Sequence, residues 1–286
     1  MNKILKTMMI KKALLTFLLL TGLHAVLVWA RPSMGMPTHQ WQDNIVKAQT
    51  FLYADRADTV MVGTSLSARI IRDSIPSVKS VSFGGCAVED GLRIISSKDK
   101  LPKYVLVEAN LMYQTGNSEL VSKLTEGAMP MIRKWIPSLR EQYEPICLLA
   151  SLLMSSGSIN PQAGAKQVDR KVLEDGIRQY IKEDRVMGND EAEQRRRTLK
   201  VLIGQLEAQG VKFVFFEMPV NKRLYHLRMF DQMRQMMSTD FPQDSYCYLP
   251  ADTSTYLTTD GKHLDFEGQQ RFSHYFKQQL SCFSLE

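Results

Sequence analysis

Residues 60–70 read VMVGTSLSARI, an apolar run that stops at Gly63-Thr64-Ser65 and then resumes. Short, uninterrupted apolar runs that end in glycine are typical of strands buried on both faces of a parallel sheet. The residues after Ser65 favour a helix, so the serine is expected in a sharp turn between strand and helix. A serine in such a turn either caps the helix or presents its hydroxyl for chemistry.

Three further segments repeat the apolar pattern, with helical stretches between them. The four strand-like segments are residues 58–63, 77–85, 103–110 and 211–219. Residues 189–210 have apolar positions at helical spacing and end at Gly210, just before the last of these runs. Strands that alternate with helices predict an α/β fold with a layered, parallel sheet and right-handed crossovers.

The stretch between the third and fourth strands breaks this rhythm. We interpret residues 111 to about 190 as a helical insertion in one domain of residues 58–286, because ~80 residues are few for an independent core. Within the insertion, Leu148–Gly157 is expected to be ordinary helix core, with an exposed apolar groove as the alternative. Arg195–Arg197 is interpreted as a solvated helix face.

The N-terminus differs from the rest of the chain. Four lysines precede an uncharged apolar run, Ala13–Ala30, apart from one histidine at position 24. This run is longer than the core of a cleavable signal and just long enough to span a bilayer, which favours a retained transmembrane helix over residues 1–30. The small residues around Ala30 keep cleavage after it as an alternative. The lysines predict that the N-terminus is cytoplasmic and the rest of the chain is outside.

The basic character of the chain comes mostly from this segment. Five of the 36 Lys and Arg residues lie within the first 31 positions, and no acidic residue precedes Asp43. The remainder carries 31 basic against 30 acidic residues, so the charge gives no reason to expect nucleic-acid binding. Residues 31–57 are interpreted as a linker and a short helix.

The cysteines indicate no metal site. The four cysteines, at positions 86, 147, 247 and 282, form no CxxC pair and no cluster of zinc-ligand spacing. In an oxidising compartment Cys247 and Cys282 could form a disulfide, and four buried thiols are the alternative. Cys86 is interpreted as a small buried filler rather than a nucleophile.

Candidate functional residues lie where the strands end, and this is where open parallel sheets bind their ligands. The first three strands deliver Ser65, Gly84, Gly85 and Asn110. Asp260 and His263 follow the fourth strand, three positions apart and just before the last helix. A serine that attacks an acyl carbon needs a histidine to take its proton and a carboxylate to orient that histidine. Ser65, His263 and Asp260 could supply these parts.

The same reaction needs hydrogen-bond donors for the developing oxyanion. The candidates are the backbone N–H of Ser65, a glycine N–H at Gly84 or Gly85, and the side-chain amide of Asn110. Each candidate also has an ordinary explanation, since serine caps helices, glycines make turns and asparagine caps strand ends. Glu108 could be structural or could line the pocket.

The order of these residues along the chain resembles that of the SGNH/GDSL hydrolase superfamily, from about Asp58 to the C-terminus. Ser65 in Gly-Thr-Ser-Leu matches the nucleophile block, Gly84 or Gly85 the oxyanion glycine, and Asn110 the oxyanion asparagine. Asp260-Gly-Lys-His263, which leads into HLDFEGQQ, matches the most specific block. Thr64 replaces the usual aspartate, and Leu111 stands where the family often has one. These departures leave the triad and the oxyanion donors intact.

The resemblance implies a three-layer α/β/α sandwich of flavodoxin-like type and a serine acyl-ester enzyme that needs no cofactor or metal. Members with an N-terminal anchor and a Gly-Thr-Ser block resemble periplasmic partners of polysaccharide O-acetylation and carbohydrate O-acyl esterases. We therefore expect an esterase or acetyltransferase of envelope or extracellular polysaccharide. It would act at the periplasmic face of the inner membrane, or as a secreted or periplasmic protein if cleaved. A membrane acyl-donor protein is the partner that the resemblance implies. A non-catalytic scaffold of an exopolysaccharide assembly complex and a lipid esterase remain alternatives.

Overall fold

The computed structural model describes residues 3–71, 74–155 and 168–282. It divides into two compact units. The N-terminal unit consists of Met1–Val46 and Gly127–Asn160, and the sheet unit consists of Lys47–Glu126 and Pro161–Glu286. The stretch interpreted from the sequence as one insertion therefore contributes to both units.

The sheet unit is built on a five-stranded parallel sheet, as the apolar runs predicted. Its strands are β1 (Thr59–Gly63), β2 (Val78–Ser82), β3 (Tyr104–Glu108), β4 (Lys212–Phe216) and β5 (Cys247–Tyr248). Their order is β2-β1-β3-β4-β5. In this order β1 and β3 are neighbours at the point where the chain reverses direction across the sheet, which is where such sheets bind ligands. The two-residue β5 was not predicted from the sequence.

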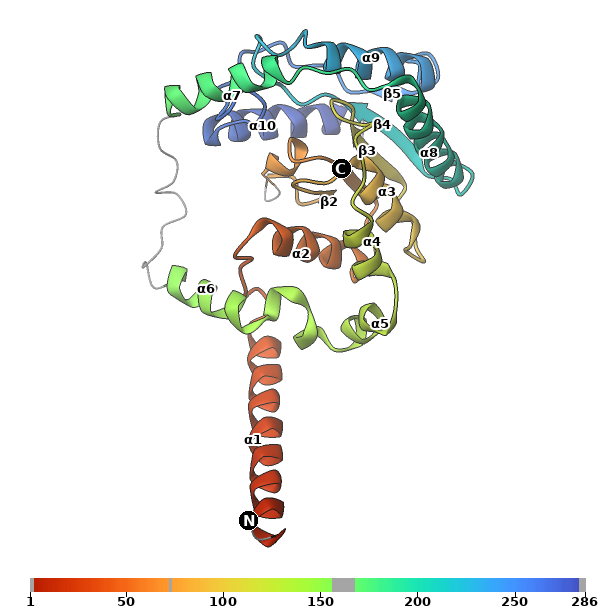
Figure 1. Cartoon of the computed structure of the whole chain (residues 1–286). Helices are drawn as coiled ribbons and strands as arrows, with labels where there is room; N and C mark the ends of the chain where they lie inside the picture. The colour runs from red at the N-terminus through yellow and green to blue at the C-terminus, as the bar shows by residue number, and fades with distance from the viewer. Residues whose placement is uncertain (1–2, 72–73, 156–167, 283–286) are drawn as a thin grey trace. The chain divides into compact units, whose positions relative to one another are not determined.

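The helices of the sheet unit connect and cover these strands (Figure 1). They are α3 (Val88–Ser96), α4 (Ser118–Thr125), α7 (Arg170–Lys182), α8 (Asn189–Glu207), α9 (Arg228–Asp240) and α10 (Phe266–Cys282). Helix α8 lies within the stretch predicted to be helical and begins at its first residue. The segment after Ser65 is shorter than predicted, because the regular structure there is a 3₁₀ helix, η1, of three residues (Ser67–Arg69).

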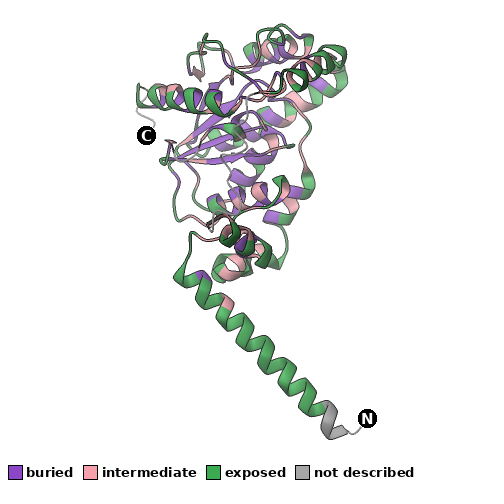
Figure 2. Ribbon diagram, turned by 90° about the vertical axis from the view of Figure 1, so that its left-hand side faces the viewer, coloured by how far each residue is buried: buried purple, intermediate pink, exposed green. Residues whose placement is uncertain are grey.

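The core of this unit forms because the strands are apolar along their length. Figure 2 shows the strands as almost continuously buried. Met61 of β1, Leu106 of β3 and Phe276 of α10 belong to one buried cluster, and the ring of Phe276 lies 4.8 Å from that of Phe216. Burial of such aromatic side chains contributes most to the stability of a core.

The N-terminal unit contains α1 (Lys3–Ala30), α5 (Ala128–Trp135), α6 (Pro145–Ser155) and the 3₁₀ helices η3 (Pro137–Leu139) and η4 (Glu141–Tyr143). Helix α2 (Gln40–Leu52) runs from this unit into the sheet unit. The segment Thr7–Ala30 of α1 has a mean hydropathy of 2.1 and is 6% buried, so within the described residues α1 is the helix long and apolar enough to cross a membrane or to serve as a signal sequence.

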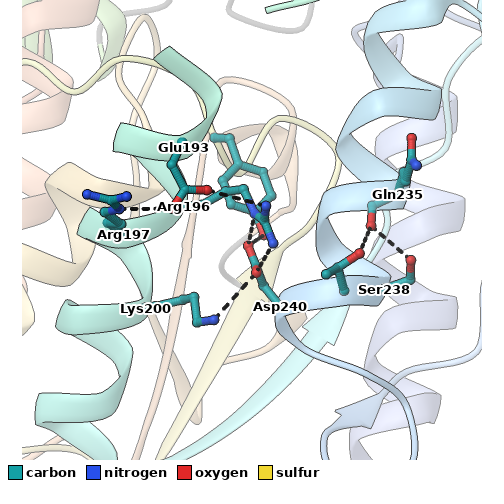
Figure 3. Close-up of polar contacts among 9 residues, drawn as sticks. Glu193, Arg196, Arg197, Lys200, Gln235, Ser238 and Asp240 are labelled. Atoms are coloured by element: carbon teal, nitrogen blue, oxygen red, sulfur yellow. Dashed lines mark hydrogen bonds and ion pairs between the residues drawn. The ribbon is translucent and has the colours of Figure 1, made fainter. Parts of the chain in front are cut away.

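Two expectations about exposed and buried helix faces were wrong. Leu149, Leu152 and Leu153 of α6 are 44–51% exposed rather than core residues; positions 156–157 of that segment lie outside the described residues. Among the three arginines of α8, only Arg197 is well exposed, whereas Arg196 reaches the carboxylate of Asp240 on α9, with a distance of 2.6 Å between Nη2 and Oδ1. Figure 3 shows Arg196 and Lys200 pointing toward Asp240.

The cysteines form no disulfide. Each of the four is an unbridged thiol, including Cys247 and Cys282, the pair considered from the sequence. Cys86 and Cys147 are buried, Cys247 is half-buried and Cys282 is exposed, so the alternative of four buried thiols is also wrong. Burial, together with the charge of Asp90, raises the pKa of Cys86 to about 12, which keeps this thiol protonated and unreactive.

Candidate active site

The structure brings Ser65, His263 and Asp260 together in the sheet unit, although Ser65 and His263 are 198 residues apart in the sequence. Ser65 Oγ lies 2.8 Å from His263 Nε2, and His263 Nδ1 lies 2.7 Å from Asp260 Oδ2. An ionised carboxylate only accepts hydrogen bonds, so neutral His263 carries its proton on Nδ1 and offers the lone pair of Nε2 to the serine hydroxyl. This is the arrangement in which a histidine can accept the proton of an attacking serine.

Asp260 is fixed by several donors. The backbone N–H groups of Lys262 and His263 donate to Oδ1 at 3.0 and 2.9 Å, and the Tyr180 hydroxyl donates to Oδ2 at 3.3 Å. Burial raises the pKa of Asp260, but the hydrogen bonds from the His263 ring and from the backbone lower it by more, so this pKa lies well below its usual range. Asp260 is therefore ionised at neutral pH and able to orient the histidine.

Glu108, the last residue of β3, accepts hydrogen bonds from the turn that carries Ser65. Glu108 is fully buried. Its Oε2 accepts the backbone N–H groups of Thr64 and Ser67 at 2.8 and 3.0 Å, and its Oε1 accepts the Thr64 hydroxyl at 2.7 Å. Two residues that flank Ser65 in sequence are thus bound to one rigid strand, which fixes the backbone of the serine between them.

Gly63 is required by this arrangement. A Cβ at position 63 would lie 2.1 Å from Ser67 Oγ and 2.7 Å from both Cβ and Oε2 of Glu108. Contacts this short cannot be accommodated without moving the turn or the buried carboxylate. The glycine that ends the first apolar run therefore allows the close approach of Glu108.

The two departures from the family pattern have structural explanations. Thr64, where the family usually has aspartate, is buried and uses its hydroxyl to bind Glu108 and to accept the backbone N–H of Leu66 at 3.3 Å. A carboxylate there would face the carboxylate of Glu108, which repulsion disfavours. Leu111, where the family often has aspartate, is buried in the apolar core.

The candidate oxyanion donors lie at neighbouring strand ends. Within the described residues, the backbone N–H of Ser65 donates no hydrogen bond. Gly84 and Gly85 follow β2, which pairs with β1, and Gly85 has a φ of 71°, a conformation that favours glycine. Asn110 follows β3 and is clamped to Met218: its Nδ2 donates to the Met218 carbonyl at 2.9 Å, and its Oδ1 accepts the Met218 N–H at 2.6 Å. The second proton of the Asn110 amide is not used by this clamp.

Sequence reasoning missed several residues that build the site. The role of Glu108 was left open, and Tyr180, Gly176 and Met218 were not identified. A Cβ at Gly176 of α7 would lie 2.5 Å from the Asp260 carbonyl oxygen, so this glycine lets α7 approach the triad. Glycine is unfavourable in a helix interior, so an unexplained glycine there suggests a close contact. Of these four residues, Gly176 is therefore the one that the sequence could have pointed to.

A cavity of about 450 Å³ lies beyond the ends of β3, β4 and β5. Its described walls include Ala109, Glu217, Arg234, Tyr248 and Leu249. None of the triad residues is on these walls, although Ala109 directly precedes Asn110. The cavity is therefore a neighbour of the candidate active site and not its nucleophile pocket.

No family model, no curated protein and no solved structure gave a significant match to this chain. The interpretation of the site consequently depends on its own geometry and on the order of its motifs. The distances between Ser65, His263 and Asp260 agree with the order of the motifs.

Proposed function

We propose that this protein is an exported serine acyl-ester enzyme, an O-acyl esterase or O-acetyltransferase, that acts through Ser65, His263 and Asp260. The observation that carries the proposal is the continuous relay from the serine hydroxyl through both histidine nitrogens to an ionised aspartate. Its substrates would be acyl esters of envelope or extracellular polysaccharide.

In the proposed reaction, Ser65 Oγ attacks the acyl carbon while His263 Nε2 takes its proton. The negative charge that develops on the acyl oxygen is stabilised by three hydrogen-bond donors. They are the backbone N–H of Ser65, the backbone N–H of Gly84 or Gly85, and the second N–H of the Asn110 side-chain amide. His263 then protonates the leaving alcohol, and Ser65 is left as an acyl ester. Water or a sugar hydroxyl, deprotonated by His263, attacks this ester and restores the serine.

We also propose that the sheet unit is a three-layer α/β/α sandwich of the SGNH/GDSL type. Met61 packs in the cluster that includes α10, whereas a Cβ at Gly91 of α3 would lie 2.1 Å from Val62 Cγ2. Successive strand residues point to opposite faces of a sheet. The contacts of Met61 and Val62 therefore support helices on both faces.

The export of the sheet unit is likewise a proposal. It rests on the apolar helix α1 and on the lysines at its N-terminal end, which favour a cytoplasmic N-terminus. A retained α1 would tether the enzyme to the outer face of the cytoplasmic membrane, where membrane-bound acyl donors and nascent polysaccharide meet.

The test uses the full-length protein in detergent and its Ser65→Ala variant. Separate samples of each are treated with a serine-directed fluorophosphonate to test labelling, or with an aryl acetate in the presence and absence of oligosaccharide acceptors to test turnover. We expect labelling and acetate release in the wild type only, with turnover reduced by a factor on the order of 10⁴ or more in Ser65→Ala. Transfer of acetate to sugar would identify a transferase, and transfer to water an esterase.

The variant also serves as a folding control, because loss of the serine hydroxyl should cost at most ~2 kcal/mol of stability. A folded wild-type protein that is neither labelled nor active toward any ester would contradict the proposal and favour the non-catalytic scaffold.

A further inference from the structure

The N-terminal unit presents apolar side chains to the outside. None of the residues of α5 is buried. Met131, Ile132, Trp135, Ile136 and Leu139 are 38–77% exposed and follow one another at helical spacing. Such spacing places them on one stripe of α5 and of the turn that follows it.

Helix α6 adds a second exposed apolar stripe. Ile146, Leu149, Leu152 and Leu153 are 44–51% exposed, while the neighbouring Cys147 and Leu148 are buried. The helix contains no charged residue, and its 11 residues are too few to cross a bilayer. Exposed apolar surface on this scale marks contact with a membrane or with another protein.

One ion pair of the same unit is largely withdrawn from solvent. The guanidinium of Arg133 lies 3.6 Å from Glu141 Oε2, and these side chains are only 14% and 7% exposed. Arg133 Nε also donates to the Leu139 carbonyl at 3.1 Å, and Arg140 Nε donates to the Arg133 carbonyl at 3.1 Å. Paired charges inside and apolar side chains outside are the reverse of the pattern expected for a protein surface in water.

This apolar surface is attached directly to α1. His24 Nε2 lies 3.1 Å from the carbonyl oxygen of Ser138 in η3. Val28 of α1 forms a small buried cluster with Tyr143 and Leu148, and the Tyr143 hydroxyl donates to the Pro32 carbonyl at 2.8 Å. The attachment therefore involves the last two turns of α1, within ~9 Å of its end at 1.5 Å per residue.

That depth corresponds to the boundary between lipid and water. If Thr7–Ala30 spans the hydrocarbon core, whose thickness is ~30 Å, the last turns of α1 lie at its outer edge. Trp29 on α1 is 84% exposed and Trp135 on α5 is 77% exposed. Exposed tryptophans are enriched at this level of the membrane, where the indole ring is partly apolar and its N–H can reach water.

We propose that α5, η3 and α6 form a membrane-embedded collar, seated in the outer interface of the bilayer that α1 crosses. The collar is defined by the exposed side chains of Met131, Ile132, Trp135, Leu149 and Leu152 and their neighbours on the two stripes. Lipid is the occupant favoured here because the stripes continue the apolar surface of α1 at the depth of its outer end. The inference rests on the proposed anchoring by α1 and adds a second, monotopic attachment.

The experiment uses the full-length protein in lipid nanodiscs and exploits its three tryptophans, at positions 29, 41 and 135. Phenylalanine replaces two of them at a time, so that each variant retains one reporter. Emission spectra are recorded with ordinary lipid and with lipid brominated near the top of the acyl chain, which quenches only indoles in contact with it. The variant that retains Trp41 provides a reference for the half-buried indole of α2.

We expect Trp135 to emit at short wavelength and to be quenched by brominated lipid to a degree similar to Trp29. Quenching of Trp29 without quenching of Trp135 would overturn the collar while leaving the anchor intact. Absence of quenching at both positions would overturn anchoring and collar together. Short-wavelength emission of Trp135 without lipid quenching would show that protein covers this surface, and it would also overturn the proposal.

A second reporter guards against a local effect of the substitutions. Met131→Trp, in a background without the three native tryptophans, places an indole elsewhere on the same stripe and should be quenched as Trp135 is. Circular dichroism of every variant, compared with that of the wild type, establishes that the fold is retained.

Discussion

Glu108 and Asp240 are both carboxylates buried in the sheet unit, but they are stabilised in different ways. Glu108 is bound by two backbone N–H groups and one hydroxyl of the turn that carries Ser65. Asp240 has a fully buried side chain and is bound by Arg196 and Lys200 of α8 and by the Tyr113 hydroxyl. The first carboxylate fixes a loop to a strand, and the second connects two helices.

The different hydrogen-bond partners of Glu108 and Asp240 indicate different structural roles. Neutral backbone donors define the path of a short loop to within a few tenths of an ångström, which suits the positioning of a nucleophile. An arginine–carboxylate pair joins elements that are far apart in sequence and contributes mainly to stability when it is complete. Loss of Glu108 should therefore be seen in turnover, and loss of the Asp240 pair in unfolding.

The largest expected effect follows from Glu108→Ala. The variant leaves two buried N–H groups of the serine turn without acceptors, and the displaced Ser65 should lower kcat by about 10²-fold or more. Glu108→Gln is the matched control, since its amide oxygen can accept both N–H groups and its NH₂ can donate to the Thr64 hydroxyl. The measurement is aryl-acetate turnover. Similar activity in Glu108→Ala and the wild type would remove Glu108 from any positioning role.

A smaller effect, on stability rather than on turnover, is expected for Arg196→Met. Asp240 then loses its bidentate partner, and the free energy of unfolding should fall by about 2–3 kcal/mol, less than the ~3–5 kcal/mol for a fully buried pair because Arg196 is partly exposed. The measurement is urea unfolding, and turnover of the folded variant should stay within about twofold of the wild type. Arg197→Met changes an exposed neighbour and should alter stability by less than ~0.5 kcal/mol.

The last expected effect concerns the pH dependence that Asp260 confers on stability; Asp260 shares features with both sites because it accepts backbone N–H groups and also the N–H of a histidine ring. Its pKa is lower in the folded protein than in the unfolded chain, so its contribution to stability is complete above about pH 4 and is lost as the pH falls through the lowered value. Asp260→Asn cannot titrate. We therefore expect the wild type to be more stable than this variant at pH 6 and the difference to shrink toward pH 3. A difference that grows as the solution is acidified would contradict the sign of this pKa shift.

The strands of the sheet were predictable because burial on both faces demands uninterrupted apolar residues. The segments that became β1, β3 and β4 consist almost entirely of such residues, and their parallel pairing followed from the helices between them. The two-residue β5 has no such signature, because its pairing is decided by where β4 lies. Helix formation after Ser65 was overestimated, since the hydrogen bonds of the turn to Glu108 compete with helical ones.

Ser65, Asp260 and His263 were predicted to lie together because their order along the chain is informative. Glu108 was undecided because sequence does not show which partner a strand-end carboxylate meets. The collar was missed for a related reason. An apolar stripe at helical spacing has the same pattern whether it faces a protein core or another apolar medium. For Leu149 and Leu152, the sequence therefore predicted helix core with an exposed apolar groove as the alternative, and it could not decide between the two.

The pairing of β3 with β4 has a consequence for how the protein folds. Strands β1, β2 and β3 lie within one continuous stretch of chain and can pair as soon as that stretch has been synthesised. The clamp between Asn110 and Met218 must close over 108 residues, and the contact between Ser65 and His263 over 198. Contacts so distant in sequence form late, because loop closure must precede them. Under the proposed function, Ser65 should therefore remain unreactive until the segment that carries His263 has docked, so that reactivity appears only in a completed molecule.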